Sequence, residues 1–482
     1  MRRSRLVVLG IVLALATAAC GSRTTQAQKD EALGVGRNGL GAGGQQLSGA
    51  EGGGASSDTG AAAGAAGSGL AAASTGGAGG GPNAAGDTAA SKNAAPPGGN
   101  GGATDVGVTG SSITVGNVSI LTGPVPGLFK GAENGTDAFF AYQNSQGGVY
   151  GRKLNLAQLD DQFDCGQNKS LTEANASKVF AFVGSFSLYD NCGAEVFNAN
   201  PNLPDIHNAL SRDASHEANN FSSQPLRTGS ATGEFQYFKD KFGPDAIANS
   251  ASLIGDVQSA RDSWTGISKV MTDMGYKFTY TRLYEPTETD FTPDIVQMQT
   301  KGVKALILVS ADVKSIARIE QAADQQHWHP TFTLLGASAY DPTLLQLAQS
   351  QVEGVWLYIP AAMYLGEDRS WNKEVDLFNS WLARTHPGDP VDLFSVYGWE
   401  SARLFVQALQ AAGPQAKRTT LIAALKNIHQ FDGNGMYPVG DPAGKGPPVC
   451  YIIVRVQGGK FTRVDDPPNG FRCDGQYELV QP

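Results

Sequence analysis

Short apolar runs alternate with helical patterns along most of the chain from residue 112 onward. Four of these runs are typical of strands: SITVGNVSIL, KLNLAQLD, VFAFVGSF and LPDIHNAL. The segment GAENGTDAFFAYQNSQGG after the first run predicts a helix that ends at a Gly-Gly stop. One face of this helix would hold Ala132, Thr136, Phe139, Phe140 and Gln143. Strands that alternate with helices predict a parallel, doubly wound sheet.

A second series of the same kind follows, with ASLIGD, YKFTYTRLYE, KALILVSA and TFTLLGAS as strands. The helix after ASLIGD carries Trp264, Ile267, Met271 and Met274. GVWLYIP is expected to pass between the two series, helices are expected at 371–384 and 397–412, and CYIIVRVQGGKFTRVD predicts a hairpin with its turn at Gly-Gly. We therefore predict two α/β lobes. The first comprises 109–233 and 361–440, and the second comprises 234–360 and 441–482.

The first residues predict export. Three arginines precede an apolar run at 6–16, which is too short to span a membrane, since spanning takes about 20 residues. Charged, apolar and small residues in that order form a secretory signal. TAAC, which ends at Cys20, resembles a bacterial lipoprotein processing site with Thr17 where leucine is commonest. We expect removal of residues 1–19 and lipidation of Cys20; a secreted protein with an incidental cysteine is the alternative.

Residues 20–108 are predicted to form a disordered tether. Stretches such as GGGASSDTGAAAGAAGSGL contain almost no aromatic or branched apolar residues, so they bury too little surface to offset chain ordering. The tether contains GVGRNG, which fits a dinucleotide-binding fingerprint. We interpret it as a chance match, because no strand precedes it and no amphipathic helix follows.

Charge and cysteine count limit the function classes. The formal net charge of -9 lacks the excess of positive charge that is typical of nucleic-acid-binding proteins. After the initial apolar run no stretch approaches membrane-spanning length, so attachment to a membrane would depend on the lipid at Cys20. Five cysteines are an odd number for an exported protein, and use of Cys20 as the lipid site leaves four that can pair.

From Ile113 to the C-terminus the chain resembles a known family. The ordered landmarks are ITVGNVSILTGP, GAENGTDAFFAYQNSQGGVYGRKLNL, DDQFDC, FVGSFS, RTGSATG, YGWESARLFVQALQAAG and LIAALKNI. They are similar to those of the branched-chain amino acid binding proteins of ABC importers, which are type I periplasmic binding proteins. The resemblance implies two Rossmann-like lobes that are joined by three crossovers and close over a solute.

The resemblance also implies the partners and the location. We expect a monomeric lipoprotein outside the cytoplasm that is anchored to the membrane by its lipid. It would capture a small organic solute and deliver it to ABC permease and ATPase subunits, without a cofactor or a nucleic-acid partner. A ligand-sensing receptor or regulator component with the same fold is the alternative function.

Ligands of open α/β sheets bind beyond the carboxyl ends of the strands, where helix N-termini present free N–H groups. In the first lobe this rule selects Phe129 after the first strand, Ser185, Ser187 and Tyr189 after FVG, and Ser211 after PDIHNAL. The resemblance implies hydroxyl and backbone contacts from these loops to a ligand carboxylate, which favours Ser187 and Ser211. The alternative for both serines is a helix N-cap.

The second lobe departs from the family pattern. After LLG, where the amino-acid binders carry an acid for the ligand's ammonium group, this chain has Ala337 and Ser338, and it has Ala260 where they carry an aromatic residue. Asp312 could replace the missing charge, or it could only cap a helix. The sequence thus favours a carboxylate-bearing solute that is otherwise largely apolar, with Ser338 beside it. An amino acid held by Asp312 is the alternative.

Four cysteines allow three disulfide connectivities. The family often bridges the region of Cys165 and Cys192, whereas Cys450 and Cys473 flank the terminal hairpin. We expect bridges from 165 to 192 and from 450 to 473.

Motifs for enzymatic chemistry are lacking in the sequence. It contains no G-x-S-x-G elbow, no H-E-x-x-H and no complete phosphate loop, so we predict that the protein is not an enzyme; a hydrolase ranks last, because no nucleophile and base can be named. His327 and His329 in HWHP could bind a metal if a third ligand approached, but a solvated loop is the favoured interpretation, and no metal is expected.

Overall fold

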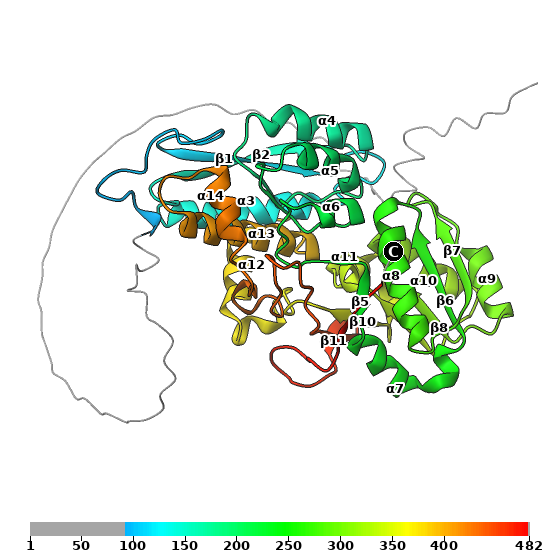
Figure 1. Ribbon diagram of the computed structural model, residues 1–482. Helices are drawn as coiled ribbons and strands as arrows, with labels where there is room; N and C mark the ends of the chain where they lie inside the picture. Colours follow the sequence, from blue (N-terminus) through cyan, green and yellow to red (C-terminus); the bar gives the residue numbers. More distant parts are fainter. Residues whose placement is uncertain (1–91, 481–482) are drawn as a thin grey trace, which may run out of the picture. The chain divides into compact units, whose positions relative to one another are not determined.

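Two sheets form the core of residues 92–480, the part of the chain that the computed structural model describes (Figure 1). The first sheet is parallel throughout, with the strand order β2-β1-β3-β4. Its strands are β1 (Ser112–Ser119), β2 (Lys153–Asp160), β3 (Phe182–Val183) and β4 (Asp205–Ile206). We refer to this sheet and the helices packed on it as the first lobe.

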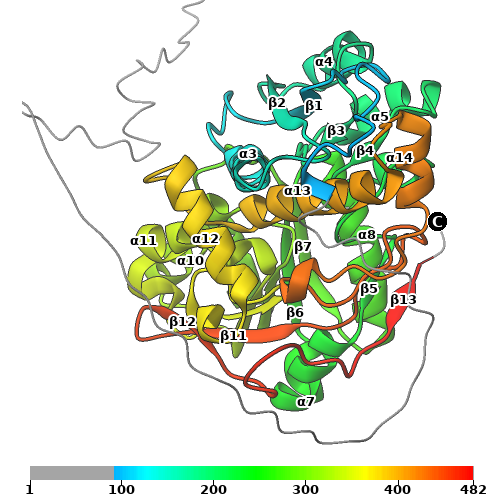
Figure 2. The same ribbon diagram turned by 90° about the vertical axis from the view of Figure 1, so that its left-hand side faces the viewer.

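Helices cover both faces of the first sheet. In Figure 1, α4 and α5 lie on one face, and α3 and α13 lie on the other, side by side in both ribbon views (Figures 1 and 2). The helices of this lobe are α3 (Lys130–Ser145), α4 (Cys165–Ala176), α5 (Asp190–Ala199), α6 (Arg212–His216), α12 (Lys373–Thr385), α13 (Leu393–Ala412) and α14 (Arg418–Leu425). The five residues predicted to share one face of α3 are all buried, and so are residues on its other faces, such as Glu133 and Asn134.

The second sheet has the order β12-β11-β10-β9-β8-β6-β7 and is parallel from β7 to β10, with β11 and β12 antiparallel at one edge. Its strands are β6 (Ser250–Gly255), β7 (Phe278–Tyr284), β8 (Ala305–Leu308), β9 (Phe332–Leu335), β10 (Trp356–Ile359), β11 (Ile452–Gln457) and β12 (Lys460–Arg463). The predicted terminal hairpin is confirmed, with Gly458 and Gly459 at positive φ between β11 and β12. We refer to this sheet and its helices as the second lobe.

The helices of the second lobe are α7 (Gly233–Ile247), α8 (Gln258–Asp273), α9 (Thr292–Thr300), α10 (Val313–Gln325) and α11 (Pro342–Ala348). The 3₁₀ turns are η1 (Ala337–Ala339), η2 (Gln349–Val352), η3 (Glu367–Ser370) and η4 (Gly433–Gly435). A small antiparallel pair, β5 (Gly229–Ala231) with β13 (Tyr477–Leu479), lies outside both main sheets.

The connectivity confirms the predicted fold class. The chain passes from β4 to β6, returns from β10 to α12 and passes again from α14 to β11, which makes three crossovers between the sheets. Each sheet begins with a central strand and then winds in both directions, as β2-β1-β3-β4 and as β7-β6-β8-β9. In a sheet of this kind the direction of winding reverses at a switch point between two adjacent strands. The switch point lies between β1 and β3 in the first sheet and between β6 and β8 in the second.

Both expected disulfides are confirmed. Cys165 at the start of α4 is bonded to Cys192 in α5, with 5.6 Å between their Cα atoms. Cys450 before β11 is bonded to Cys473 after β12, with 4.3 Å between their Cα atoms. The first bridge fastens the two helices that cover one face of the first sheet, and the second fastens the end of the chain to the hairpin.

The predicted extent of the tether, 20–108, is wrong at its C-terminal end. Residues 92–108 lie on the first lobe, where the buried Arg152 guanidinium donates hydrogen bonds to the carbonyl oxygens of Asn100 and Gly102. Thr104 donates to the Ala416 carbonyl, and the Asp105 carboxylate accepts from the Arg418 N–H. Polar contacts to the backbone therefore order a segment that buries few apolar side chains.

The signal at 1–19, Cys20, the match GVGRNG and the tether up to residue 91 lie outside the described residues. The limits of the two lobes given above stay predictions. Within residues 92–480, no helix combines the length and the apolar character needed to cross a bilayer.

Candidate functional site

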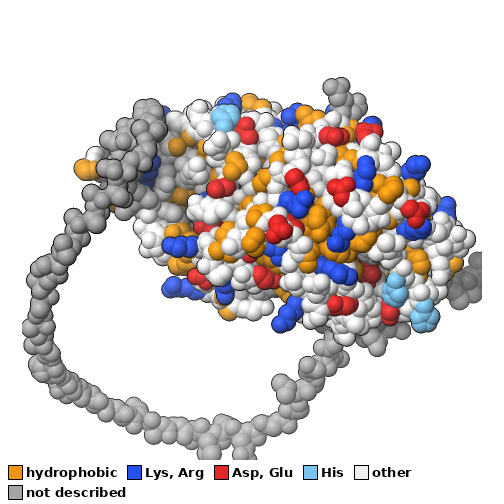
Figure 3. Space-filling view, turned by 90° about the horizontal axis from the view of Figure 1, so that it is seen from below, with side chains coloured by type: hydrophobic (Ala, Val, Ile, Leu, Met, Phe, Trp, Pro, Cys, Tyr) orange, Lys and Arg blue, Asp and Glu red, His pale blue; other side chains and the backbone are white. Residues whose placement is uncertain are grey.

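A cleft of about 470 Å³ opens between the two lobes, and most of the side chains that line it are apolar. Its walls are the loops that follow β1, β3 and β4 of the first sheet and β6, β8 and β9 of the second. These are the carboxyl ends of the parallel strands, where open α/β sheets bind ligands. In Figure 3, apolar side chains gather in the middle of the face seen from below, with charged side chains around them. The cleft volume suits a small organic molecule.

The first lobe supplies an aromatic wall made of Phe129, Phe186 and Phe394. Their ring centroids lie 4.6–5.0 Å apart, and the Tyr397 ring stacks on Phe186 at 5.5 Å. Phe129 directly precedes α3, and Phe394 lies in the first turn of α13, so the wall depends on the packing of these two helices. All four aromatic residues line the cleft.

The helices α3 and α13 cross so closely that glycine is required on both. A Cβ at Gly135 in α3 would overlap the Ser395 carbonyl oxygen, and a Cβ at Gly398 in α13 would overlap the Ala132 carbonyl oxygen. The Asp392 carboxylate caps α13 by accepting from the Ser395 N–H at 2.7 Å. This crossing holds Phe129 and Phe394 at the same end of the helix pair.

Four of the predicted ligand-binding residues line the cleft: Phe129, Ser211, Asp312 and Ser338. Two of them also cap helices, as the alternative interpretation proposed. Ser211 Oγ accepts from the Ala214 N–H at 3.2 Å in α6, and Asp312 Oδ1 accepts from the N–H groups of residues 314 and 315 at 3.0 Å in α10. Their contact with a solute stays a prediction.

The structure corrects the placement of Ser185, Ser187 and Tyr189, which do not line the cleft. Ser185 Oγ accepts from the Val118 N–H at 3.0 Å, whereas Ser187 Oγ donates to Asp161 and accepts from the Tyr189 N–H at 3.1 Å. The two serines border a small separate cavity in the first lobe. The physical reason is that neighbouring side chains of this loop point to opposite sides: residues 186 and 188 line the cleft, whereas residues 185 and 187 border the small cavity.

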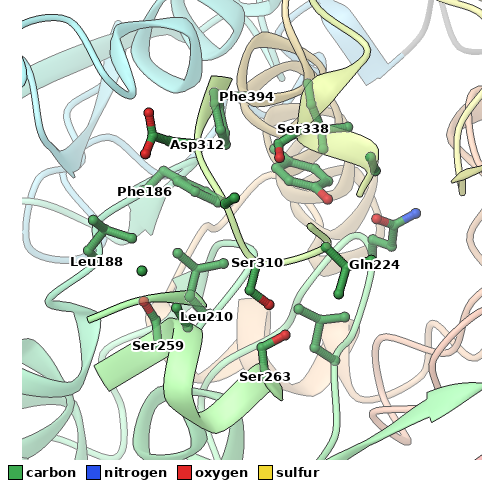
Figure 4. Close-up of a pocket in the computed structure, with 18 of the residues that line it drawn as sticks. Phe186, Leu188, Leu210, Gln224, Ser259, Ser263, Ser310, Asp312, Ser338 and Phe394 are labelled. Carbon is green, nitrogen blue, oxygen red and sulfur yellow. The ribbon is translucent and has the colours of Figure 1, made fainter. Parts of the chain in front are cut away.

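Three serines of the second lobe line the cleft and were missed by the sequence reasoning: Ser259, Ser263 and Ser310 (Figure 4). The Oγ atoms of Ser259 and Ser310 are buried and have no hydrogen-bond partner within residues 92–480. The available signal was topological. These serines follow β6 and β8, the strands on either side of the switch point, whereas the resemblance to the family drew attention to their neighbours Ala260 and Asp312.

Burial raises the pKa values of three acids at the edge of the cleft. Burial raises the pKa of Glu234 to about 8 and that of Asp392 to about 7. Burial also raises the pKa of Asp341. At the rim, the Arg212 N–H donates to Asp262 Oδ2 at 3.1 Å, which joins the first lobe to the second.

The small cavity of the first lobe contains an ionic cluster under the cleft loops. His207 Nδ1 lies 2.8 Å from Asp205, and its Nε2 lies 3.8 Å from Asp190. Burial lowers the pKa of His207, but the two carboxylates outweigh burial and raise it to about 10. Asp190 also accepts from the N–H groups of Leu210 and Ser211. The cluster thus positions a loop that lines the cleft.

No group of three or more His, Cys, Asp and Glu side chains within residues 92–480 is arranged to hold a metal ion. His327 and His329 are both exposed and lie in the loop after α10. The favoured interpretation of HWHP as a solvated loop agrees with this placement.

Comparisons with known proteins agree with the observed fold. A family model described as periplasmic binding protein matches residues 112–460. Among curated proteins, no match was found. The chain is similar to a solved branched-chain amino acid ABC transporter protein from Thermus thermophilus with bound valine, at 14% identity and a TM-score of 0.65, over 76% of this chain and 97% of that one.

Two further solved structures share the fold. A fatty acid ABC transporter substrate-binding protein from Thermomonospora curvata has 19% identity and a TM-score of 0.64, over 77% of this chain and 95% of that one. A leucine-binding protein from Thermotoga maritima has 14% identity and a TM-score of 0.61, over 73% of this chain and 98% of that one. The names of these proteins refer to ligands that range from amino acids to fatty acids. Because their sequences are less than 20% identical to this chain, the similarity shows a shared fold and not a shared ligand.

Proposed function

The chain belongs to the periplasmic binding protein family, and from this premise we propose that it captures a small, largely apolar organic solute with a carboxylate group and delivers it to an ABC importer. The observation that carries the proposal is the mainly apolar cleft between the carboxyl ends of the two sheets. Solved proteins of this fold named for amino acid and for fatty acid transport support the same class of solute.

The apolar wall favours a solute with a hydrocarbon part. Phe129 and Phe186 are almost fully buried, and Phe394 and Leu188 are partly exposed toward the cleft. Apolar surface removed from water contributes about 25 cal/mol per Å². A branched or linear hydrocarbon chain that covers these side chains would therefore supply much of the binding free energy.

The acids of the cleft argue against an obligatory ammonium group on the solute. A buried ammonium needs a charged partner, because an unpaired ion in a closed cleft costs several kcal/mol. Glu234, Asp341 and Asp392 have raised pKa values. Asp262 accepts from the Arg212 N–H and from Gln258 Nε2, and Asp312 already accepts two backbone N–H groups. An amino acid held by Asp312 stays the alternative solute.

Calorimetric titration of the chain with Cys20→Ala tests the proposal. We expect 3-methylbutanoate and 4-methylpentanoate, the carboxylates that match valine and leucine without the amino group, to bind, and to bind equally well after Asp312→Asn. Tight binding of leucine alone, abolished by Asp312→Asn, would establish the amino-acid alternative. Absence of binding by either acid and by longer fatty acids would refute the proposed solute class.

The anchor is proposed to be a lipid on Cys20, and Cys20→Ala is expected to move the protein from the membrane fraction to the soluble fraction. The sequence after residue 16 contains no other stretch of membrane-spanning length. A single acyl chain binds membranes only weakly, so we expect at least two chains on the mature protein. The measurement is fractionation with mass spectrometry of the N-terminal peptide. A membrane-bound variant would contradict the anchor.

An importer role requires partner subunits. Genes for two permeases and two ATPases beside the gene for this chain would support delivery to an importer. A neighbouring gene for a signalling subunit, without permeases, would support the sensing alternative instead.

A further inference from the structure

The switch point of the second sheet faces the cleft. It lies between β6 and β8, and their continuations are held together because the Gly255 N–H donates to the Ser310 carbonyl oxygen at 3.3 Å. The helix α8 begins three residues after Gly255, and its first turn lines the cleft. The helix N-terminus and the loop after β8 therefore meet at one place in the wall of the second lobe.

Three hydroxyl groups are present at this place. Ser259 is only 3% exposed, and its Oγ atom has no hydrogen-bond partner within residues 92–480. The buried Ser310 Oγ atom also lacks a partner there. Ser263 lies four residues after Ser259 and hence on the same face of α8. In the view of Figure 4, the hydroxyl groups of Ser263 and Ser310 point toward one another.

The backbone of α8 adds hydrogen-bond donors. Its N-cap residue, Val257, provides no side-chain cap, and the first intrahelical bond runs from the Arg261 N–H to the Val257 carbonyl at 3.1 Å. The N–H groups of residues 258–260 thus have no backbone acceptor in the described part of the chain. Free N–H groups and the helix dipole of this 16-residue helix favour a negative charge and disfavour a positive one.

A buried hydroxyl without a partner is costly, and Ser259 and Ser310 both lie at a helix end that favours anions. From this juxtaposition we infer that the solute carboxylate binds to the second lobe, at the N-terminus of α8 and the hydroxyl groups of Ser259, Ser263 and Ser310. The hydrocarbon part would then lie against the aromatic wall of the first lobe. The inference rests on the proposed function and reverses the polarity that the sequence favoured, in which serines of the first lobe hold the carboxylate.

The two acids near this site are already hydrogen-bonded to other donors, which reduces their repulsion of a solute carboxylate. Asp262 accepts from the Arg212 N–H and from Gln258 Nε2, and Asp312 accepts from two N–H groups of its own helix. Lys314 and the exposed Arg212 also line this part of the cleft and contribute positive potential.

The test compares a carboxylate probe with a neutral probe of the same shape, 4-methylpentanoate and 4-methylpentanamide, in calorimetric titration of the chain with Cys20→Ala. Hydrogen bonds to a charged group are strong, so Ser259→Ala is expected to weaken binding of the acid about 10-fold and Ser259→Ala with Ser310→Ala about 100-fold. The amide should change by less than about threefold. Ser268→Ala, which removes a serine of α8 outside the cleft, is the matched control and should leave both affinities unchanged.

A second variant guards against loss of folding. Ser259→Asp places a carboxylate in the first turn of α8, which should keep or raise the melting temperature while it abolishes binding of the acid. Unchanged acid affinity in the double variant, loss of acid binding through Ser187→Ala, or equal losses for acid and amide would each overturn the inference. Failure of the wild-type cleft to bind any carboxylate would refute the proposed function and the inference with it, whereas wild-type binding that the serine variants leave intact would refute the inference alone.

Discussion

Gly135→Ala is expected to lower the free energy of unfolding by about 3 kcal/mol or more, because the new Cβ would overlap the Ser395 carbonyl oxygen of the neighbouring helix. Alanine has a higher helix propensity than glycine by about 1 kcal/mol, but this gain is smaller than the cost of pushing two helix backbones apart. The measurement is urea and thermal unfolding. We also expect weaker binding of apolar carboxylates, since separation of α3 from α13 displaces Phe129 from Phe394.

Gly166→Ala in α4 is the matched control. This exposed glycine lies in the first turn of a helix, and a Cβ there would contact only Oδ1 of the exposed N-cap residue Asp164, at 3.2 Å. We expect equal or slightly higher stability, by up to about 1 kcal/mol. Equal stability of the Gly135→Ala variant and the wild type would show that the helix crossing relaxes and that the close approach is not required.

The fold could be predicted from the sequence because each lobe repeats one periodic pattern. The strands β1, β2, β7, β8 and β9 lie within predicted runs, β6 begins one residue before its run, and α13 begins at Leu393, four residues before the predicted 397. The predicted runs VFAFVGSF and LPDIHNAL yield ladders of only two residues each, β3 and β4. An apolar run predicts that a segment is buried. The number of residues that pair as a strand also depends on the neighbouring strands, which the run itself does not reveal.

The loops of the candidate site could be predicted as well, but the directions of their side chains could not. The loop after β3 does reach the cleft, yet it presents Phe186 and Leu188 rather than Ser187. A shift of one residue in extended backbone turns every side chain to the opposite face, and hydroxyl content alone does not fix that register. Topology places the serines of α8 and of the loop after β8 at the second switch point, but which of their side chains face the cleft emerged only from the structure.

A buried cation, Arg152, makes several of the polar contacts that hold residues 92–108 on the first lobe. Arg152 in the turn before β2 is 1% exposed, and burial lowers its pKa. Its guanidinium donates to four carbonyl oxygens: Thr109 at 2.7 Å, Pro414 at 2.6 Å, Asn100 at 2.5 Å and Gly102 at 2.9 Å. These bonds join the C-terminal part of the predicted tether to the residues just before β1 and just after α13. Backbone carbonyl groups are the same in every residue, so contacts to them cannot be predicted from sequence composition. The tether was therefore predicted to extend to residue 108.

Arg152→Met should therefore destabilise the protein by about 3–5 kcal/mol, because it removes four charge-assisted hydrogen bonds and leaves buried carbonyl groups without donors. Arg152→Lys should recover only part of this loss, since an ammonium group lacks the planar fork that reaches several acceptors at once. The global effect is measured by urea unfolding, and hydrogen exchange of the amides of residues 99–112 reports the local effect.

Lys153→Met is the control for Arg152, because the neighbouring lysine is exposed in β2 and its replacement should change stability by less than about 0.5 kcal/mol. If Arg152 holds residues 92–108 in place, Arg152→Met will accelerate hydrogen exchange of the amides of that segment more than exchange of the amides of the second lobe under native conditions. Uniform acceleration across both lobes would mean that Arg152 supports the whole body rather than this attachment. Unchanged protection of residues 99–112 in a destabilised variant would show that the contacts of Thr104 and Asp105 hold the segment without Arg152.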